Sequence, residues 1–224
     1  MGDANQLQFV EQHAKGLHGP YLEVGAKDYG STQDLQRLFA EEDEYVRVDM
    51  ADGPGVDEVL DLTLPLDQID ARLAGRRFGT IFCLSVLEHC RAPFAMAENL
   101  TQLLRPAGQI CLSVPFAWKF HGYPSDYWRF TAEGVKVLFP RLAFDPGDCV
   151  AATSRDGEFH AIDEQLGKIS FGASPHWRQG RLLRGLSAKG LKLLSQVGLL
   201  RWLAGHRYVL APTNLLMIGR LAGE

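Results

Sequence analysis

Tyr21–Gly30, which reads YLEVGAKDYG, is the stretch around which the rest of the chain can be arranged. A short apolar run ends near an acid, Glu23, and a glycine, Gly25, and a polar turn then runs to Gly30. This pattern is typical of a buried parallel strand that enters a tight turn before a helix. Ligands of open α/β sheets bind outside the carboxyl ends of the strands, where glycine lets the backbone approach them. The stretch therefore predicts a nucleotide-like ligand at this turn, with Glu23 facing it.

Strand-like and helix-like segments alternate on either side of this stretch. Apolar runs predict strands at residues 44–49, 58–61, 78–85, 109–114 and 140–153, and helical spacing predicts helices at residues 6–17, 32–42, 65–75 and 92–104, with Thr32 capping the second. Strands that alternate with helices of this length are typical of a doubly wound, Rossmann-like parallel sheet. We therefore expect an α/β fold with a cofactor-binding core at about residues 18–153.

The composition is that of one soluble globular domain, residues 1–224, because 46% of the residues are hydrophobic and 22% are charged. A net charge of -4 argues against a general nucleic-acid binder. The N-terminus lacks the apolar core of a signal peptide, and no run approaches the ~20 apolar residues that span a bilayer. We therefore expect a cytoplasmic protein.

The four cysteines stand singly and have no histidine at ligand spacing, which predicts neither a disulfide framework nor a zinc site. Cys83 and Cys111 lie inside apolar runs, so we expect them to fill the core. No metal is expected from this pattern.

Acids close the first three predicted strands, at Glu23, Asp49 and Asp61. One acid alone is more often a solvated turn residue. Three at successive parallel-strand ends, however, lie along one edge of the sheet. Asp49 also follows the first strand at about the interval at which an acid meets ribose hydroxyls in such folds, and a carboxylate accepts hydrogen bonds from a diol strongly.

The turn helps to distinguish a dinucleotide from S-adenosylmethionine. A pyrophosphate site requires GxGxxG, but here Ala26 and Lys27 follow Gly25. None of the six tyrosines has a lysine four residues later, so the Tyr/Lys pair of short-chain dehydrogenases is missing as well. An NAD(P)-dependent oxidoreductase is the less favoured alternative.

The ordered segments LEVGAKDYG, VRVDM, VLDL, FGTIFCLSVLEHC and LLRPAGQICLSVPF resemble the small-molecule branch of the class I S-adenosylmethionine-dependent methyltransferases, of the methyltransferase type 11 kind. The resemblance covers about residues 21–139. It implies a seven-stranded sheet whose last strand, at about residues 213–221, runs antiparallel between the fifth and sixth. It also implies S-adenosylmethionine as the cofactor.

The resemblance further implies roles for individual positions. Glu23, Gly25, Ala26 and Gly30 match the cofactor loop, although Lys27 and Tyr29 replace two of the family's usual glycines. The other matched positions are Asp49 at the ribose, Met50 on the adenine, Asp61 and Leu62 at the adenine edge, and Ser85 and Val86 under the methionine half, with Glu88 and His89 completing that motif. His89 has a second interpretation, as a residue that hydrogen-bonds the neighbouring loop.

The segment Phe116–Thr131, FAWKFHGYPSDYWRFT, is expected to hold the acceptor, because interleaved aromatic and polar residues suit a sugar ring or another flat substrate. The candidate catalytic residues are His121, Asp126 and Tyr123, and the candidate substrate-binding residues are Trp118, Tyr127 and Arg129. Two alternatives remain open. The aromatic residues, Phe130 above all, can complete the core, and Arg129 can pair with Asp126 or Glu133.

The region before the last strand differs from the rest in charge. From Gln165 to Gly223 there are nine Lys or Arg residues and no Asp or Glu. Helical spacing puts leucines on one face and basic residues opposite, which predicts a helical insertion at about residues 160–207. It is either a lid over the substrate loop or, through residues 178–203, a peripheral contact with a membrane or a lipid-linked substrate.

These observations together predict an enzyme that transfers a methyl group from S-adenosylmethionine to a hydroxyl, or another nucleophile, of a small-molecule or sugar-like acceptor. The competing hypothesis is a non-catalytic nucleoside-binding module that is recruited through its basic C-terminal segment. The sequence leaves the oligomeric state open.

Overall fold

The computed structural model describes residues 4–30, 34–39, 43–122, 125–163, 166, 173–178, 180–196 and 212–222. The chain divides into two compact units. The first comprises Met1–Ile162 together with Pro212–Glu224, and the second is Asp163–Ala211. The second unit overlaps the helical insertion predicted at about residues 160–207, and the expectation of a single domain stays a prediction.

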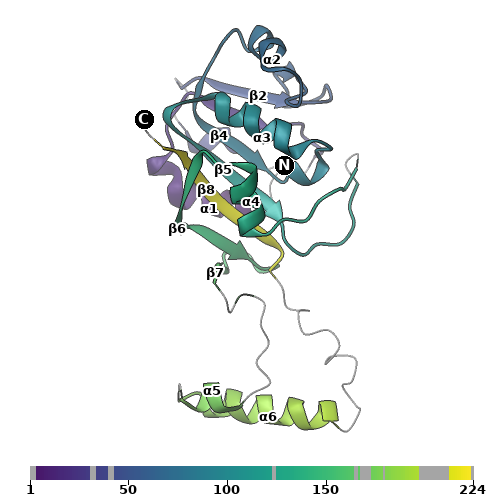
Figure 1. The fold of residues 1–224 in the computed structure, drawn as a ribbon, viewed down its shortest axis with the longest axis vertical. Coiled ribbons are helices and arrows are strands. Elements are labelled where there is room, and N and C mark those ends of the chain that lie inside the picture. The colour runs from purple at the N-terminus through teal and green to yellow at the C-terminus, as the bar shows by residue number, and fades with distance from the viewer. Residues whose placement is uncertain are drawn as a thin grey trace. The chain divides into compact units, whose positions relative to one another are not determined.

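An eight-stranded sheet forms the centre of the first unit (Figure 1). Its strands are β1 (Tyr21–Val24), β2 (Tyr45–Asp49), β3 (Glu58–Val59), β4 (Phe78–Leu84), β5 (Leu104–Pro115), β6 (Leu142–Ala152), β7 (Phe159–Ala161) and β8 (Asn214–Leu221). Their order in space is β3-β2-β1-β4-β5-β8-β6-β7. The strands from β1 to β5 pair in parallel, whereas β8 is antiparallel to both β5 and β6. The predicted doubly wound sheet with an antiparallel last strand between the fifth and sixth is confirmed.

The predicted number of seven strands is one too few. The additional strand, β7, forms an antiparallel pair with the end of β6 at the sheet edge. Its three residues, Phe-His-Ala, are only partly buried or exposed. So short a segment has no apolar run that could have marked it as a strand.

Helices cover both faces of the sheet (Figure 1). In the first unit they are α1 (Ala4–His13), α2 (Leu66–Arg72), α3 (Pro93–Gln102) and α4 (Ala132–Leu138), with 3-10 turns η1 (Ala14–Gly16), η2 (Gln36–Leu38) and η3 (Leu87–His89). On one face, α1 buries Phe9 and Val10 in a core cluster that also contains Phe82 of β4. In Figure 1, α3 and α4 lie in front of the sheet and α1 lies behind it.

The helix predicted for residues 32–42 is wrong over its described part. Only the turn η2 forms there, and the backbone of Phe39 is already extended, with φ -122° and ψ 162°. The extension lets Phe39 pack on Tyr21, with ring centroids 4.3 Å apart, and on Phe82. Aromatic packing in the core thus takes precedence over helical spacing. The proposed cap, Thr32, lies outside the described residues.

All four cysteines are free and buried, and Cys83 and Cys111 are fully enclosed. The prediction that these two fill the core is confirmed. Burial also raises the pKa of the Cys111 thiol to about 12, which makes it a poor nucleophile near neutral pH.

The second unit contains α5 (Ala173–Arg178) and α6 (Leu182–Gln196). The two helices meet closely at Gly185, where an added Cβ would clash with the indole of Trp177. Ala188 is buried, whereas the leucines of α6 with large exposed surfaces are Leu182, Leu183, Leu186, Leu193 and Leu194. Residues 179 and 197–203 of the predicted basic segment lie outside the described residues. Within the described parts of the chain, no helix is long and apolar enough to cross a membrane.

Candidate active site

The loop after β1 turns sharply at Gly25, whose φ of +72° is in the left-handed region that favours glycine. The backbone N–H groups of Gly25 and Ala26 both donate to Val48 O, at 2.9 and 3.1 Å. Gly30 also has a positive φ, and an added Cβ there would meet open space. Lys27 Nζ lies 5.6 Å from the ring centroid of Tyr29, so these two residues form a cation–π contact at positions where the family's glycines would stand.

Asp49, the last residue of β2, ties this loop to the next one. Its Oδ2 accepts a hydrogen bond from Lys27 N at 3.2 Å, and its Oδ1 accepts one from Ala51 N at 2.9 Å. An ionised carboxylate has about four lone-pair sites, so each oxygen can still accept a hydrogen bond from a vicinal diol. Met50 follows with 67% of its surface exposed, where a flat ring could pack on it. The ribose and adenine roles of these two residues stay predictions.

Glu23 was predicted to face the ligand at this turn, but its side chain is buried. It is one residue short of the end of β1, only 8% of its surface is exposed, and its Oε2 accepts a hydrogen bond from Tyr45 Oη at 2.8 Å. Burial raises the pKa of this carboxyl above its ordinary value, although the Tyr45 hydrogen bond opposes the shift. Glu23 therefore links β1 to the first residue of β2.

Asp61 lies two residues beyond β3 rather than at its end. Its Oδ1 accepts hydrogen bonds from the backbone N–H of Thr63 at 2.8 Å and from the Thr63 hydroxyl at 2.7 Å, which shapes a local turn. The Leu62 side chain is buried in the core, and its carbonyl accepts from Asn99 Nδ2 at 2.9 Å. Their predicted contact with the adenine edge stays a prediction.

Ser85, directly after β4, has a φ of +54°, which is uncommon for a residue with a Cβ. Such backbone strain is concentrated at functional sites. The Ser85 hydroxyl accepts a hydrogen bond from Gln6 Nε2 at 2.7 Å, and Gln6 Nε2 also donates to Ser113 Oγ at 2.7 Å. Gln6 comes from α1 and is 2% exposed. Sequence reasoning missed it, because its partners lie 79 and 107 residues away. The predicted role of Val86, the next residue, stays untested.

The segment around η3 and the aromatic loop are joined by three hydrogen bonds. His89 Nδ1 lies 2.5 Å from Ser125 O, Tyr127 N donates to Glu88 O at 2.8 Å, and Trp128 Nε1 donates to Cys90 O at 2.8 Å. The interpretation of His89 as a residue that hydrogen-bonds the loop is confirmed. The predicted cofactor motif and the predicted acceptor loop therefore share one local structure.

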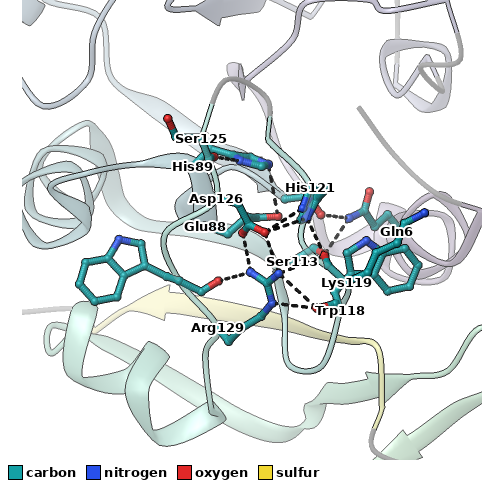
Figure 2. A network of polar contacts seen from close by, with 12 residues as sticks. Gln6, Glu88, His89, Ser113, Trp118, Lys119, His121, Ser125, Asp126 and Arg129 are labelled. Atoms are coloured by element: carbon teal, nitrogen blue, oxygen red, sulfur yellow. Dashed lines mark hydrogen bonds and ion pairs between the residues drawn. The ribbon is translucent and has the colours of Figure 1, made fainter.

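Asp126 and Arg129 form the centre of that structure (Figure 2). The Asp126 side chain is 2% exposed and accepts two hydrogen bonds from the Arg129 guanidinium, at 2.5 and 2.8 Å, and one from His121 N at 2.9 Å. The Arg129 pairing holds the pKa of the Asp126 carboxyl well below its usual range. A carboxylate that resists protonation is a weak base. The geometry therefore argues against Asp126 as the catalytic base and favours a role in positioning the loop.

Arg129 also donates to backbone carbonyl oxygens of the loop, at Trp118, Lys119 and Trp128. Of the alternatives that the sequence left open, the pair with Asp126 is the one present. Because the guanidinium donors are used by the loop itself, the geometry argues against the predicted capture of an acidic group on the acceptor.

Glu88, His89 and His121 lie beside this ion pair (Figure 2). The two imidazole ring centroids are 4.9 Å apart in an edge-to-face arrangement. Glu88 is 1% exposed, and its burial raises the pKa of the carboxyl to about 8. Burial also lowers the pKa of His89, which is therefore neutral near pH 7. His121 has the most exposed side chain of the three.

Aromatic side chains of the loop extend into solvent. Trp118 and Tyr127 are 45% and 44% exposed, and Phe120 and Trp128 are exposed as well. Phe130, by contrast, is buried, which confirms the core role that the sequence left open for it. Exposed aromatic rings beside a polar cluster suit a flat or sugar-like ligand. The predicted catalytic residue Tyr123 lies outside the described residues.

No family model matches this chain, and no curated protein matches it. Solved structures do. A 1,6-didemethyltoxoflavin-N1-methyltransferase from Burkholderia thailandensis, with bound S-adenosylhomocysteine, matches with a TM-score of 0.54 and 14% identity over 98% of this chain and 80% of its own. A SAM-dependent methyltransferase from Archaeoglobus fulgidus matches with a TM-score of 0.56 and 13% identity over 98% and 95%. The cyclase SpnF matches with a TM-score of 0.52 and 12% identity over 97% and 81%. The chain therefore has the class I S-adenosylmethionine-dependent methyltransferase fold.

Proposed function

We propose that this protein transfers a methyl group from S-adenosylmethionine to a hydroxyl, or another nucleophile, of a small-molecule or sugar-like acceptor. The observation that carries the proposal is the order of polar groups along the carboxyl edge of the sheet. The left-handed turn at Gly25 comes directly after β1, and the Asp49 carboxylate is at the end of β2. The strained Ser85 comes directly after β4, and the aromatic loop follows β5. A ligand that contacts all four would be a nucleoside with an extended tail.

The cofactor would supply an electrophilic methyl group on a sulfonium. The chain's own contribution is mainly alignment, because holding two reactants in line can be worth ~7 to 11 kcal/mol. Asp49 would hold the ribose, and the strained turn at Ser85, fixed by Gln6, would lie under the methionine half. When the acceptor oxygen bonds to the methyl carbon, the sulfur keeps the electron pair of the broken bond.

A hydroxyl acceptor must also lose its proton, and His121 is the favoured base among the predicted residues. Its side chain is partly exposed and directly follows the exposed Phe120 in the loop, whereas Asp126 is paired with Arg129. The proton would pass from the acceptor oxygen to the imidazole. The exposed Trp118 and Tyr127 would stack on the acceptor ring.

The fold by itself leaves the reaction open, since the matched structures include a cyclase as well as methyltransferases. The test is incubation with S-adenosylmethionine and a panel of hydroxyl-bearing sugars and phenols, with release of S-adenosylhomocysteine as the readout. We expect acceptor-dependent release that is lost in Asp49→Ala. Binding of the nucleoside without release for any acceptor would instead favour the non-catalytic nucleoside-binding module.

A further inference from the structure

We propose that Glu88, His89 and His121 form a binding site for one divalent transition-metal ion, with Zn²⁺ as the ion that best fits two imidazoles and one carboxylate. One ligand atom from each residue lies within 4.8 Å of the others. Figure 2 shows the three side chains converging beside the Asp126–Arg129 pair. The spacing of cysteines and histidines along the chain predicted no metal, because the ligands come from two separate segments.

Within the part of the chain that the structure describes, the buried carboxyl group of Glu88 lacks a hydrogen-bond partner at one of its two oxygens. Its side chain is 1% exposed, yet Oε2 has no hydrogen-bond partner among the described residues. Buried polar atoms are nearly always paired, so an orphaned one calls for an explanation. Its other oxygen, Oε1, is 3.9 Å from His89 Nε2. Two ligands of a tetrahedral zinc ion lie roughly 3.4 Å apart, so a small closing movement would complete the pair.

Both imidazoles are held as metal ligands usually are. His89 Nδ1 lies 2.5 Å from the carbonyl oxygen of Ser125, so that nitrogen carries the proton and Nε2 keeps its lone pair. His121 Nδ1 lies 3.3 Å from Lys119 O and 3.4 Å from Asp126 Oδ2. A carbonyl or carboxylate behind the ligating imidazole is the common second partner in zinc sites, because it fixes the tautomer and the ring.

The three ligands would leave at least one coordination position for a solvent or ligand oxygen. The His121 side chain is 21% exposed, which gives an entry path from the side of the aromatic loop. The consequence of the metal ion for catalysis rests on the proposed function. A metal ion makes a bound hydroxyl more acidic, and His121 would then be a ligand instead of the base.

The test uses tag-free protein, stripped with a chelator and titrated with Zn²⁺ in a calorimeter without nucleoside or acceptor. We expect one Zn²⁺ per chain. Glu88→Gln and His121→Ala should weaken binding by more than the 10- to 100-fold that the loss of an outer partner costs. The matched control is His160→Ala, because His160 is exposed and pairs with Glu158 at 3.1 Å outside the cluster. It should bind as the wild type does.

Co²⁺ provides a second readout, because coordination by imidazole and carboxylate should give a visible absorption band that His121→Ala loses. Melting curves check that each variant is folded, and the partly exposed His121 carries the test if Glu88→Gln fails to fold. Wild-type protein that binds no stoichiometric Zn²⁺, or variants that bind as tightly as the wild type, would overturn the site. Neither result would touch methyl transfer, which is assayed separately.

Discussion

The two sides of the candidate active site are built differently. On the cofactor side, Asp49 ends β2 and Asp61 lies in the loop after β3, and each accepts a hydrogen bond from the backbone N–H two residues later. On the acceptor side, Asp126 pairs with Arg129, Arg129 also donates to loop carbonyls, and the backbone N–H of Tyr127 donates to Glu88 O. An exposed, pre-shaped edge can receive a nucleoside, whereas a buried ionic network mainly holds a loop in place.

From this difference we predict that removing a member of the ionic network lowers the free energy of unfolding. Arg129→Ala leaves the Asp126 carboxylate buried without its partner, so we expect the free energy of unfolding to fall by about 3 kcal/mol. Urea unfolding measures this change. The control is Arg141→Ala, whose pair with Glu98 is long, at 3.9 Å, and about half exposed, and whose loss should cost less than ~0.5 kcal/mol. Equal effects in the two variants would contradict the structural role of Arg129.

Replacing His121 should change the turnover rate without changing the affinity for the cofactor product. If it acts on the acceptor, His121→Ala should lower kcat by about 100-fold while leaving the affinity for S-adenosylhomocysteine unchanged. Steady-state rates and calorimetry of the same samples measure the two quantities, with His160→Ala as the matched control. A parallel loss of affinity for S-adenosylhomocysteine would contradict the role of His121 on the acceptor side.

Glu23 predicts a pH dependence of stability on the cofactor side. Its pKa is raised by burial, so above pH 4.5 the unfolded chain ionises before the folded one. Its contribution to stability is fully present below that pH and is lost as the pH rises through the folded pKa. The slope is on the order of 1 kcal/mol per pH unit within this window. Wild-type stability should therefore fall relative to Glu23→Gln between pH 4.5 and neutrality, and a constant difference in urea midpoints would contradict this.

The smallest effect is expected in the second unit. Arg181, Arg184 and Lys192 are exposed, and we expect that changing them to Glu hardly alters flotation with anionic vesicles. A peripheral membrane contact predicts a contribution of about 1 kcal/mol for each basic residue, which added salt would screen. Wild-type protein that floats with anionic but not neutral lipid, and a triple variant that does not float, would contradict this expectation.

The sequence was informative where one segment carried its own signal. The order of apolar runs and strand-end acids predicted the parallel sheet and the position of Asp49 beside the loop of Gly25, and the resemblance to the methyltransferases implied the antiparallel last strand. It failed where packing between distant segments decides the structure. The extended backbone at Phe39 allows its ring to pack in an aromatic cluster. The strand β7 is formed by pairing with the end of β6 at the sheet edge.

The acceptor side shows the same limit. The sequence located the aromatic loop and named Asp126 and Arg129, yet assigned them to chemistry because their mutual pairing was only one of several alternatives. It missed Gln6, and it missed the convergence of Glu88 with two histidines. These residues contact partners that lie 36 to 79 positions away in the sequence, so no local sequence pattern identifies them.

Calorimetric titration of S-adenosylhomocysteine into the wild type and Asp49→Ala tests the central claim most directly. We predict one nucleoside per chain for the wild type. The variant should bind more weakly by roughly 1.5 to 3 kcal/mol, about 10- to 150-fold, because a hydrogen bond to a charged group is lost while the fold is kept. Wild-type protein that binds no S-adenosylhomocysteine, or an Asp49→Ala variant of unchanged affinity, would contradict a methyltransferase site at this edge of the sheet.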